Sequence, residues 1–158
     1  IKLIVPYREN LLEPASYKLR LGDEYRLDGI DKKLTDNDPI LTIPPHGIAI
    51  VRTYEWINLP GYLIARWNLK VKKVYQGLVW VGGPQVDPGY QGFLICPLYN
   101  LSNREVKLKY KEPLFLIDFV RTSVYDGSKG CHLWQADPSQ STTSLGAVSY
   151  THLTLPTN

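Results

Sequence analysis

The residues whose types and spacing could do chemistry gather first in one short segment. Asp87 stands before Pro88-Gly89, an aromatic residue, Tyr90, follows, and Gly92 closes the segment. Proline followed by glycine favours a turn, and a turn carried by a rigid scaffold can present a carboxylate and an aromatic ring to the same pocket. Residues 86–92 therefore form a candidate site.

Other polar residues each allow two interpretations. Lys107, Lys109 and Lys111 alternate with apolar residues, so they could hold phosphate or form the solvated face of a strand, which we favour. Asp118 interrupts an apolar run and could be catalytic, although a hydrogen bond to a neighbouring loop is the preferred interpretation. His46 follows two prolines and is expected to be an exposed turn residue.

The two cysteines, Cys96 and Cys131, form no CxxC pair and are far apart in sequence. Neither a disulfide framework nor a zinc site is expected from them, and a reducing, cytoplasmic location is predicted. Cys131 and His132 are neighbours, but adjacent residues of a strand point to opposite faces, so they do not form a nucleophile relay.

Length and composition limit the class of protein. The 158 residues suit one domain, and 44% hydrophobic with 21% charged residues is a globular composition. No run of 18 apolar residues is present, so no transmembrane helix is predicted. The net charge of +3 is too small and too evenly spread to indicate a nucleic-acid or membrane partner.

The local patterns predict an all-β fold. Short apolar runs bounded by glycine and proline predict strands at 48–51, 62–65, 78–81, 93–95 and 114–120, and strict alternation predicts another at 106–110. A further strand is predicted to start after Pro14 and to end in a glycine turn at Gly22. The only helical signal is a single turn within 7–12, so a sandwich or barrel-like domain is expected.

Three segments, taken in order, resemble the dCTP deaminase and trimeric dUTPase superfamily. Residues 14–22 read Pro-Ala-Ser-Tyr-Lys-Leu-Arg-Leu-Gly, Ala65-Arg66 opens the second motif, and 86–92 read Val-Asp-Pro-Gly-Tyr-Gln-Gly. They are similar to the Pro-Ala-Ser-x-Asp-Leu-Arg-Leu-Gly, Arg-Ser-Ser and Ile-Asp-Pro-Gly-Phe/Tyr-x-Gly motifs of the deaminase branch. Residues 48–60, with Arg52-Thr53 and Glu55, also look like the intervening segment, so the resemblance covers about residues 12–122.

The resemblance implies a distorted β-barrel of the β-clip type that forms a homotrimer. It also implies active sites at subunit interfaces that bind a deoxynucleoside triphosphate, dCTP or dUTP, together with Mg²⁺. By the same resemblance Asp87 is the candidate catalytic residue, Tyr90 packs on the deoxyribose, and Arg66, Asn68 and Gly92 complete the nucleotide-binding set, with no metal ligand assigned.

The departures from these motifs concern the chemistry. Lys18 stands where the first motif has an aspartate, and Trp67-Asn68 stand where the second has two serines. Val71 stands at an expected arginine, and Pro97 stands where deaminases carry the glutamate that moves protons. The sequence therefore predicts a deoxynucleotide-binding domain that has lost deamination; an active dCTP deaminase or dUTP diphosphatase and a purely structural trimerisation module are the alternatives.

Three regions are predicted along the chain. Residues 1–122 form the dCTP deaminase/dUTPase-like domain, and 123–146 form a loop or the start of a truncated C-terminal region. Residues 147–158 resemble the translation of a sequencing-library adapter and are expected to be non-native. The chain contains no methionine, and a fragment of a longer gene is the expected origin.

Overall fold

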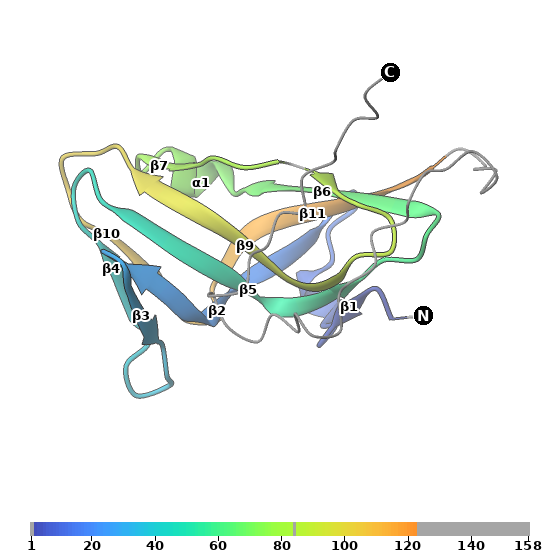
Figure 1. Ribbon diagram of the computed structural model, residues 1–158, viewed down its shortest axis with the longest axis horizontal. Coiled ribbons are helices and arrows are strands. Elements are labelled where there is room, and N and C mark those ends of the chain that lie inside the picture. Colours follow the sequence, from blue (N-terminus) through green and yellow to red (C-terminus); the bar gives the residue numbers. More distant parts are fainter. Residues whose placement is uncertain (1, 84, 123–158) are drawn as a thin grey trace, which may run out of the picture.

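A computed structural model describes residues 2–83 and 85–122 and gives an almost entirely β architecture (Figure 1). The elements in chain order are β1 (Ile4–Val5), η1 (Glu9–Leu11), β2 (Tyr17–Leu27), β3 (Ile30–Lys33), β4 (Ile40–Ile43), β5 (Ile48–Asn58), β6 (Leu63–Leu69), α1 (Val71–Val74), β7 (Leu78–Trp80), β8 (Gln85–Val86), β9 (Gln91–Asn100), β10 (Val106–Lys109) and β11 (Pro113–Arg121). Neither helix among these residues exceeds four residues, and neither is long and apolar enough to cross a membrane. The predicted all-β class is confirmed.

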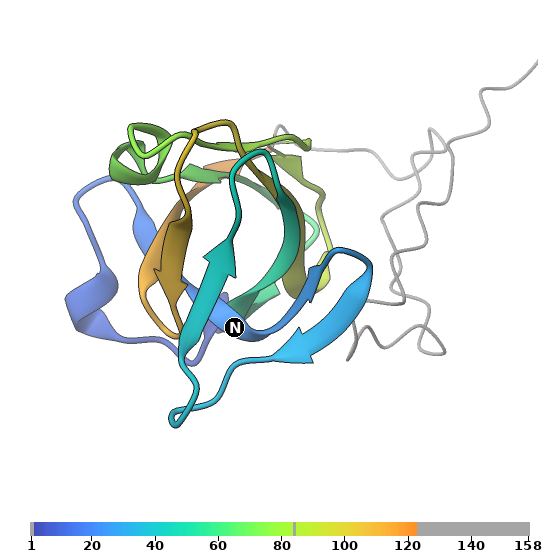
Figure 2. The same ribbon diagram turned by 90° about the vertical axis from the view of Figure 1, so that its left-hand side faces the viewer.

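One large antiparallel sheet dominates the domain. Its strands follow the order β7-β9-β5-β2-β11-β6-β8, β1 adds to β5 and β3 adds to β2, while β4 and β10 form a separate two-stranded sheet. Seen end-on in Figure 2, the large sheet curls around its own interior like an incomplete barrel. The curl brings residues that are distant in the sequence to one core.

The core follows from the period of two along each strand. Along β5 and β9 every second residue is buried, and the residues between them face outward. The predicted alternation is confirmed over 106–109, since Val106 and Leu108 are buried and Lys107 and Lys109 are exposed, whereas Tyr110 already lies in the following turn. Each fully buried leucine stabilises the fold by roughly 1.5–3 kcal/mol. Because Lys107 and Lys109 are the exposed residues of β10, they form the solvated face of this strand.

The prediction of a turn at Gly22 is wrong. Strand β2 continues through this residue to Leu27, and its pairing with β5 changes register between Leu21 and Tyr25. A Cβ atom on Gly22 would lie 2.7 Å from the carbonyl oxygen of Thr53 and 2.8 Å from that of Arg52. The glycine is needed because the neighbouring backbone approaches closely, a role that a single sequence does not distinguish from a turn.

Some of the sequence predictions concern segments beyond residue 122. The boundary at 123, the loop at 123–146, the adapter-like tail at 147–158 and the Cys131-His132 pair all lie outside the described residues.

Candidate functional site

The candidate segment 86–92 folds as the tight turn expected of its sequence. The Tyr90 amide donates to the Asp87 carbonyl oxygen at 3.2 Å, and Gly89 has φ 80°. Pro88 and Gly89 thus occupy the two central positions of a type II turn, the second of which requires positive φ. The Asp87 carboxylate is exposed and accepts a 3.2 Å hydrogen bond from Nε2 of Gln85.

Tyr90 is held against the start of β9. Its hydroxyl donates to the Phe93 carbonyl oxygen at 2.6 Å, and its own carbonyl accepts from the Leu59 amide at 2.8 Å. A Cβ atom on Gly92 would lie 2.9 Å from the Tyr90 hydroxyl oxygen, so the absence of a side chain at Gly92 leaves room for the Tyr90 ring. Gly92 therefore acts on the position of Tyr90.

Strand β6 presents two of the candidate residues to solvent. Arg66 and Asn68 lie on its exposed face, whereas Trp67 between them is buried against Trp80 and Phe115, with ring centroids 4.5 and 4.9 Å away. The indole at 67 therefore fills the core and does not stand on the face that Arg66 and Asn68 share.

Arg66 is engaged by a carboxylate on the next strand. Its Nε and Nη2 donate to Oδ2 of Asp118 at 3.0 and 2.6 Å, across directly paired positions of β6 and β11. The preferred interpretation of Asp118 as a structural hydrogen-bonding residue agrees with this contact, although its partner lies on a strand instead of a loop. Any anion that binds Arg66 has to compete with this pair.

Asn68 keeps a donor available. Its Oδ1 accepts from the Leu69 amide at 3.0 Å and from Nε1 of Trp80 at 2.9 Å. Both partners can only donate, which fixes the oxygen toward them and the amide nitrogen away from them. No acceptor for that nitrogen is found among residues 2–83 and 85–122.

The sheet brings β6 and the turn side by side. Gln85 of β8 pairs with Arg66, and Val86 pairs with Ala65, so Asp87 emerges next to the exposed face of β6. Gly92, by contrast, pairs with Ile57 on β5. The turn therefore links the β6 edge, with Arg66, to the β5–β9 pair.

Pro97 lies on the outward face of β9, half-buried, and pairs with Ile50. The outward side chains before and after it on β9 are Ile95 and Tyr99. The neighbouring thiol of Cys96 points into the core, and burial raises the pKa of this thiol far above its ordinary value. Position 97 and its strand neighbours thus offer no carboxylate for moving protons.

Lys18 carries its own counter-ion. Its Nζ lies 2.6 Å from Oε1 of Glu13, and the hydrogen bond from Lys18 lowers the pKa of the Glu13 carboxyl. Magnesium prefers carboxylate oxygens together with phosphate and water. Within the described ranges no three His, Cys, Asp or Glu side chains are grouped to hold a metal, and a lysine stands at the aspartate position. These residues do not fit a protein-held Mg²⁺.

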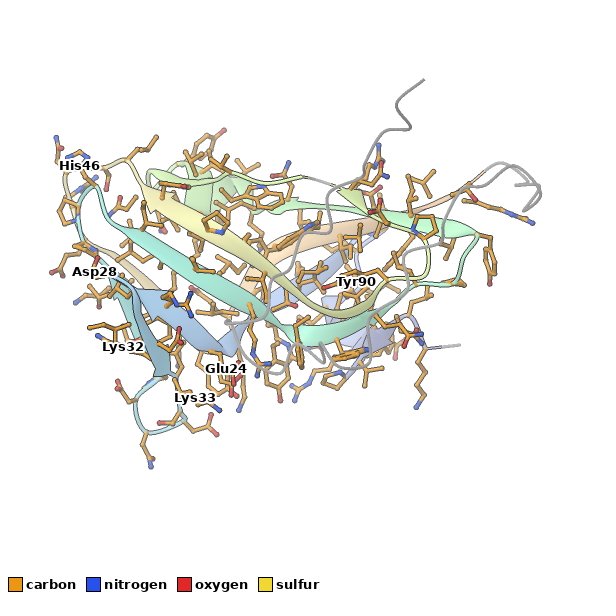
Figure 3. The ribbon with its side chains drawn as sticks, viewed as in Figure 1. Glu24, Asp28, Lys32, Lys33, His46 and Tyr90 are labelled. Carbon is orange, nitrogen blue, oxygen red and sulfur yellow. The ribbon has the colours of Figure 1, made fainter. Side chains whose placement is uncertain are left out.

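His46 is the exposed turn residue that was expected. Its backbone has φ 59°, and its Nε2 lies 3.1 Å from Oδ1 of Asn103. Figure 3 places it at the end of the long axis away from Tyr90, so it takes no part in the candidate site.

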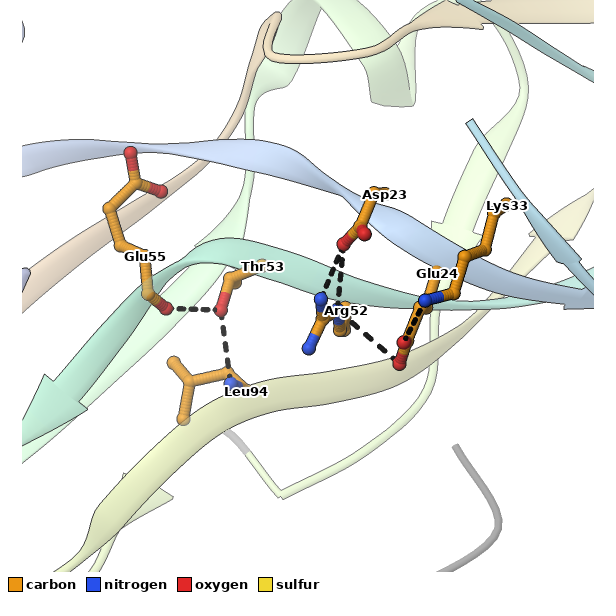
Figure 4. Close-up of polar contacts among 7 residues, drawn as sticks. All are labelled: Asp23, Glu24, Lys33, Arg52, Thr53, Glu55 and Leu94. Atoms are coloured by element: carbon orange, nitrogen blue, oxygen red, sulfur yellow. Dashed lines mark hydrogen bonds and ion pairs between the residues drawn. The ribbon is translucent and has the colours of Figure 1, made fainter. Parts of the chain in front are cut away.

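Sequence reasoning missed two charged clusters on β2 and β5. In the first, Arg52 donates hydrogen bonds to Asp23 (Figure 4). Glu24 forms ion pairs with Nζ of Lys33 at 3.1 Å and with Nε of Arg52 at 3.7 Å. Burial raises the pKa of Asp23, but the hydrogen bond and charge of Arg52 outweigh burial and lower it. Nothing in the alternation of β5 indicates this cluster, because Arg52 lies on the outward face.

The second cluster is a buried ion pair. Glu55 is fully buried and accepts from the Arg20 amide at 2.8 Å and from Nε of Arg20 at 2.6 Å. Burial raises the pKa of Glu55, and the hydrogen bonds from Arg20 oppose that rise. A signal was present, since the alternation of β5 assigns Glu55 to the inward face, where a carboxylate needs a partner.

Comparison with known proteins identifies the family. The family model described as dCTP deaminase-like matches residues 1–122. The dCTP deaminase of Thermococcus kodakarensis is 38% identical over 123 residues, covering 75% of this chain and 76% of that protein. The chain belongs to the dCTP deaminase-like family, and residues 1–122 carry a domain of this nucleotide-metabolism class.

Solved structures agree on the fold. The deoxycytidine triphosphate deaminase of Agrobacterium tumefaciens aligns with a TM-score of 0.64 at 17% identity, over 77% of this chain and 44% of that protein, so this chain spans less than half of its length. A mutant dUTPase of phage phi11 of S. aureus, solved to show how a structural Mg(II) ion is coordinated, aligns with a TM-score of 0.55 at 13% identity, over 84% and 89%. At these identities the likeness establishes the dUTPase-like fold alone.

Proposed function

We propose that this domain binds a deoxynucleoside triphosphate, dCTP or dUTP, and has lost the ability to deaminate dCTP. The observation that carries the proposal is Pro97 on β9, flanked on its outward face by Ile95 and Tyr99. Proline has no proton to transfer, and general acid–base catalysis contributes about 10²- to 10⁴-fold to a rate. Val71, exposed at the start of α1, stands where the deaminase motif has an arginine, so the positive charge of that arginine is missing as well.

Binding relies on groups that do not depend on Pro97. In this proposal the amide nitrogen of Asn68 donates to a phosphate oxygen, Arg66 exchanges Asp118 for the triphosphate, and Tyr90 packs on the deoxyribose. Asp87, exposed beside β6, receives a polar group of the nucleoside or a water molecule. No step of the proposal needs a protein-held metal ion; magnesium would arrive on the triphosphate.

The same proposal includes a homotrimer. An outward sheet face that carries Ile50, Trp56, Phe93 and Ile95, all half-buried, supports burial against another copy. Sedimentation at micromolar concentration measures the state, and a stable monomer contradicts the trimer.

The decisive experiment pairs turnover with binding. Ammonia release from dCTP is measured beside the Thermococcus kodakarensis deaminase as a positive control, and dUTP, dCTP and dTTP are titrated calorimetrically with Mg²⁺. We expect no ammonia above the buffer rate and saturable binding that Tyr90→Ala weakens. Asp118→Asn should strengthen binding, because it removes the carboxylate that competes with the triphosphate for Arg66 and leaves the turn unaltered.

An active deaminase is the second candidate, favoured by the 38% identity to a protein named dCTP deaminase. Robust ammonia release that Asp87→Asn abolishes would establish the enzyme and refute the loss of chemistry. Absence of both turnover and binding would refute nucleotide binding and leave the trimerisation module.

A further inference from the structure

An open pocket of about 250 Å³ lies between η1, β2 and the turn that precedes β11. Within the described part of the chain it is lined by Arg8, Asn10, Leu11, Arg20, Lys111 and Pro113, of which three are cations and none is a carboxylate. Small-molecule sites typically measure about 300–1,000 Å³, so this pocket suits a group of phosphate size better than a whole nucleotide.

Arg20 provides a donor that has no acceptor among the described residues. Its side chain is buried, its amide and Nε bind Glu55, and its guanidinium lies 4.4 Å from the Tyr54 ring centroid. Nη2 of Arg20 is buried and has no hydrogen-bond partner in the part of the chain that the structure describes. Unmatched buried donors are costly, and Arg20 lines the pocket, so an acceptor bound against its guanidinium would lower this cost.

Lys111 is fixed at the pocket by its backbone. Its amide donates to the Leu21 carbonyl oxygen at 3.0 Å, and its φ of 63° is unusual for a residue with a side chain. Such positions concentrate at functional sites. Its Nζ lies 2.9 Å from Oδ1 of Asp36, but the Asp36 side chain is 81% exposed, and an exposed pair of this kind is weak and exchangeable.

Arg8 gives the pocket one positive charge that no carboxylate of the described residues balances. Glu55 balances Arg20 and Asp36 balances Lys111, whereas the Arg8 guanidinium has no ion pair or hydrogen bond with any described residue. The Arg8 amide donates to the Tyr17 hydroxyl at 2.9 Å, which ties the backbone of η1 to β2. With respect to residues 2–83 and 85–122, the pocket therefore combines one free cation, one exchangeable cation and one unmatched guanidinium donor.

We propose that this pocket binds a phosphoryl group, either inorganic phosphate or the phosphate of a monoester. The tetrahedral oxyanion accepts from Arg20 on the floor and from Arg8 and Lys111 at the rim, and Arg is well suited to such contacts because its donors lie in a planar fork. The site is distinct from the candidate nucleotide residues on β6, the β8–β9 turn and β9, and it does not rest on the proposed function.

The test uses the full chain and inorganic phosphate. Phosphate is titrated at constant pH and ionic strength, and its dissociation constant is measured by phosphorus NMR and by the rise of Tm relative to chloride. Arg8→Gln and Lys111→Gln should each weaken binding about tenfold or more, the effect of losing a hydrogen bond to a charged group. Lys107→Gln is the matched control: it removes the same charge from the exposed face of β10 and should leave the constant unchanged.

Comparing two ligands and two variants shows whether the phosphoryl group is free or esterified and which site binds it. Protection by both phosphate and dCMP, lost in Arg8→Gln, supports a monoester ligand; protection by phosphate alone supports the free anion. The proposal is overturned if phosphate has no effect, if both pocket variants bind like the wild type, or if Asp87→Asn removes the effect while Arg8→Gln does not.

Discussion

Replacing Glu55 by glutamine should destabilise the domain severely. Glu55 has no exposed surface and holds both the amide and Nε of Arg20, which is itself only 4% exposed. Glutamine keeps the shape but removes the charge, and its NH₂ group faces one of the two N–H donors. Breaking a buried ion pair in this way costs about 3–5 kcal/mol, a large part of the roughly 5–15 kcal/mol that stabilises a typical domain.

The double variant Arg20→Met/Glu55→Leu should behave differently. Burial raises the pKa of Glu55, which means that the desolvation of its charge is not fully recovered from Arg20. Apolar replacement of both partners removes the two desolvation costs together, a change that is often neutral or stabilising by about 1–4 kcal/mol. It also leaves the backbone amide of residue 20 without its acceptor, which costs about 1–3 kcal/mol. The double variant should be more stable than Glu55→Gln, and far more stable than the sum of the single changes.

Urea unfolding at neutral pH measures these free energies, and Tm provides a second reading, with a loss of roughly 10–20 °C expected for Glu55→Gln. Exposed Glu105→Gln is the control and should change stability by less than about 0.5 kcal/mol. A cost below about 1 kcal/mol for Glu55→Gln, or strict additivity in the double variant, would refute the description of this pair as buried and coupled.

Three further predictions concern the stability of the folded domain. Gly22→Ala should cost roughly 1–3 kcal/mol in urea unfolding, because its Cβ would lie 2.7 Å from a backbone oxygen that cannot move aside; a neutral result would show that β2 and β5 can separate here. Asn100→Ala should cost roughly 2–4 kcal/mol in the same assay, because the two N–H donors of the buried amide are shared among three backbone carbonyl oxygens; a cost under about 1 kcal/mol would contradict this role. Asp23 has a lowered pKa, so its contribution is present above its unfolded pKa of about 3.9 and is lost as the pH falls through the lower folded value. Arg52→Gln should flatten this acid dependence of the urea midpoint, and an unchanged slope would assign it to other carboxylates.

The strands were predictable because their signals are local. The alternation of Val106 and Leu108 with lysines, and the Pro-Gly turn after Asp87, depend only on residues that are neighbours in the chain. Gly22 was misread because its requirement comes from β5, about thirty residues away, where carbonyl oxygens occupy the space of a Cβ atom. A requirement set by a distant strand leaves no mark in the adjacent sequence.

The sequence could nominate the residues of the candidate site but not their hydrogen-bond partners. The sequence nominated Arg66 and Asn68, but only the structure shows that Asp118 already holds Arg66 and that Trp80 orients the Asn68 amide. Both partners come from other strands. The pocket at Arg20 was not predicted either, because Arg8 and Lys111 are distant from Arg20 in the sequence and come close to it only in the folded domain.

The period of two along each strand explains how the fold and the chemistry of the site can diverge separately. Lys18, Asn68 and Pro97, three departures from the deaminase motifs, do not belong to the buried set, whereas their neighbours in the chain, Leu19, Leu69 and Leu98, are buried and apolar. The proline also stands where pairing with β7 has already ended, since the last pair of that ladder joins Trp80 to Leu98. Exchanging a carboxylate for a lysine or a proline on the outward face therefore changes what the surface can bind or protonate and leaves the core contacts intact. Trp67 is the departure that points inward: its indole packs in the core against Trp80 and Phe115, so replacing it would now remove core packing instead of changing the surface.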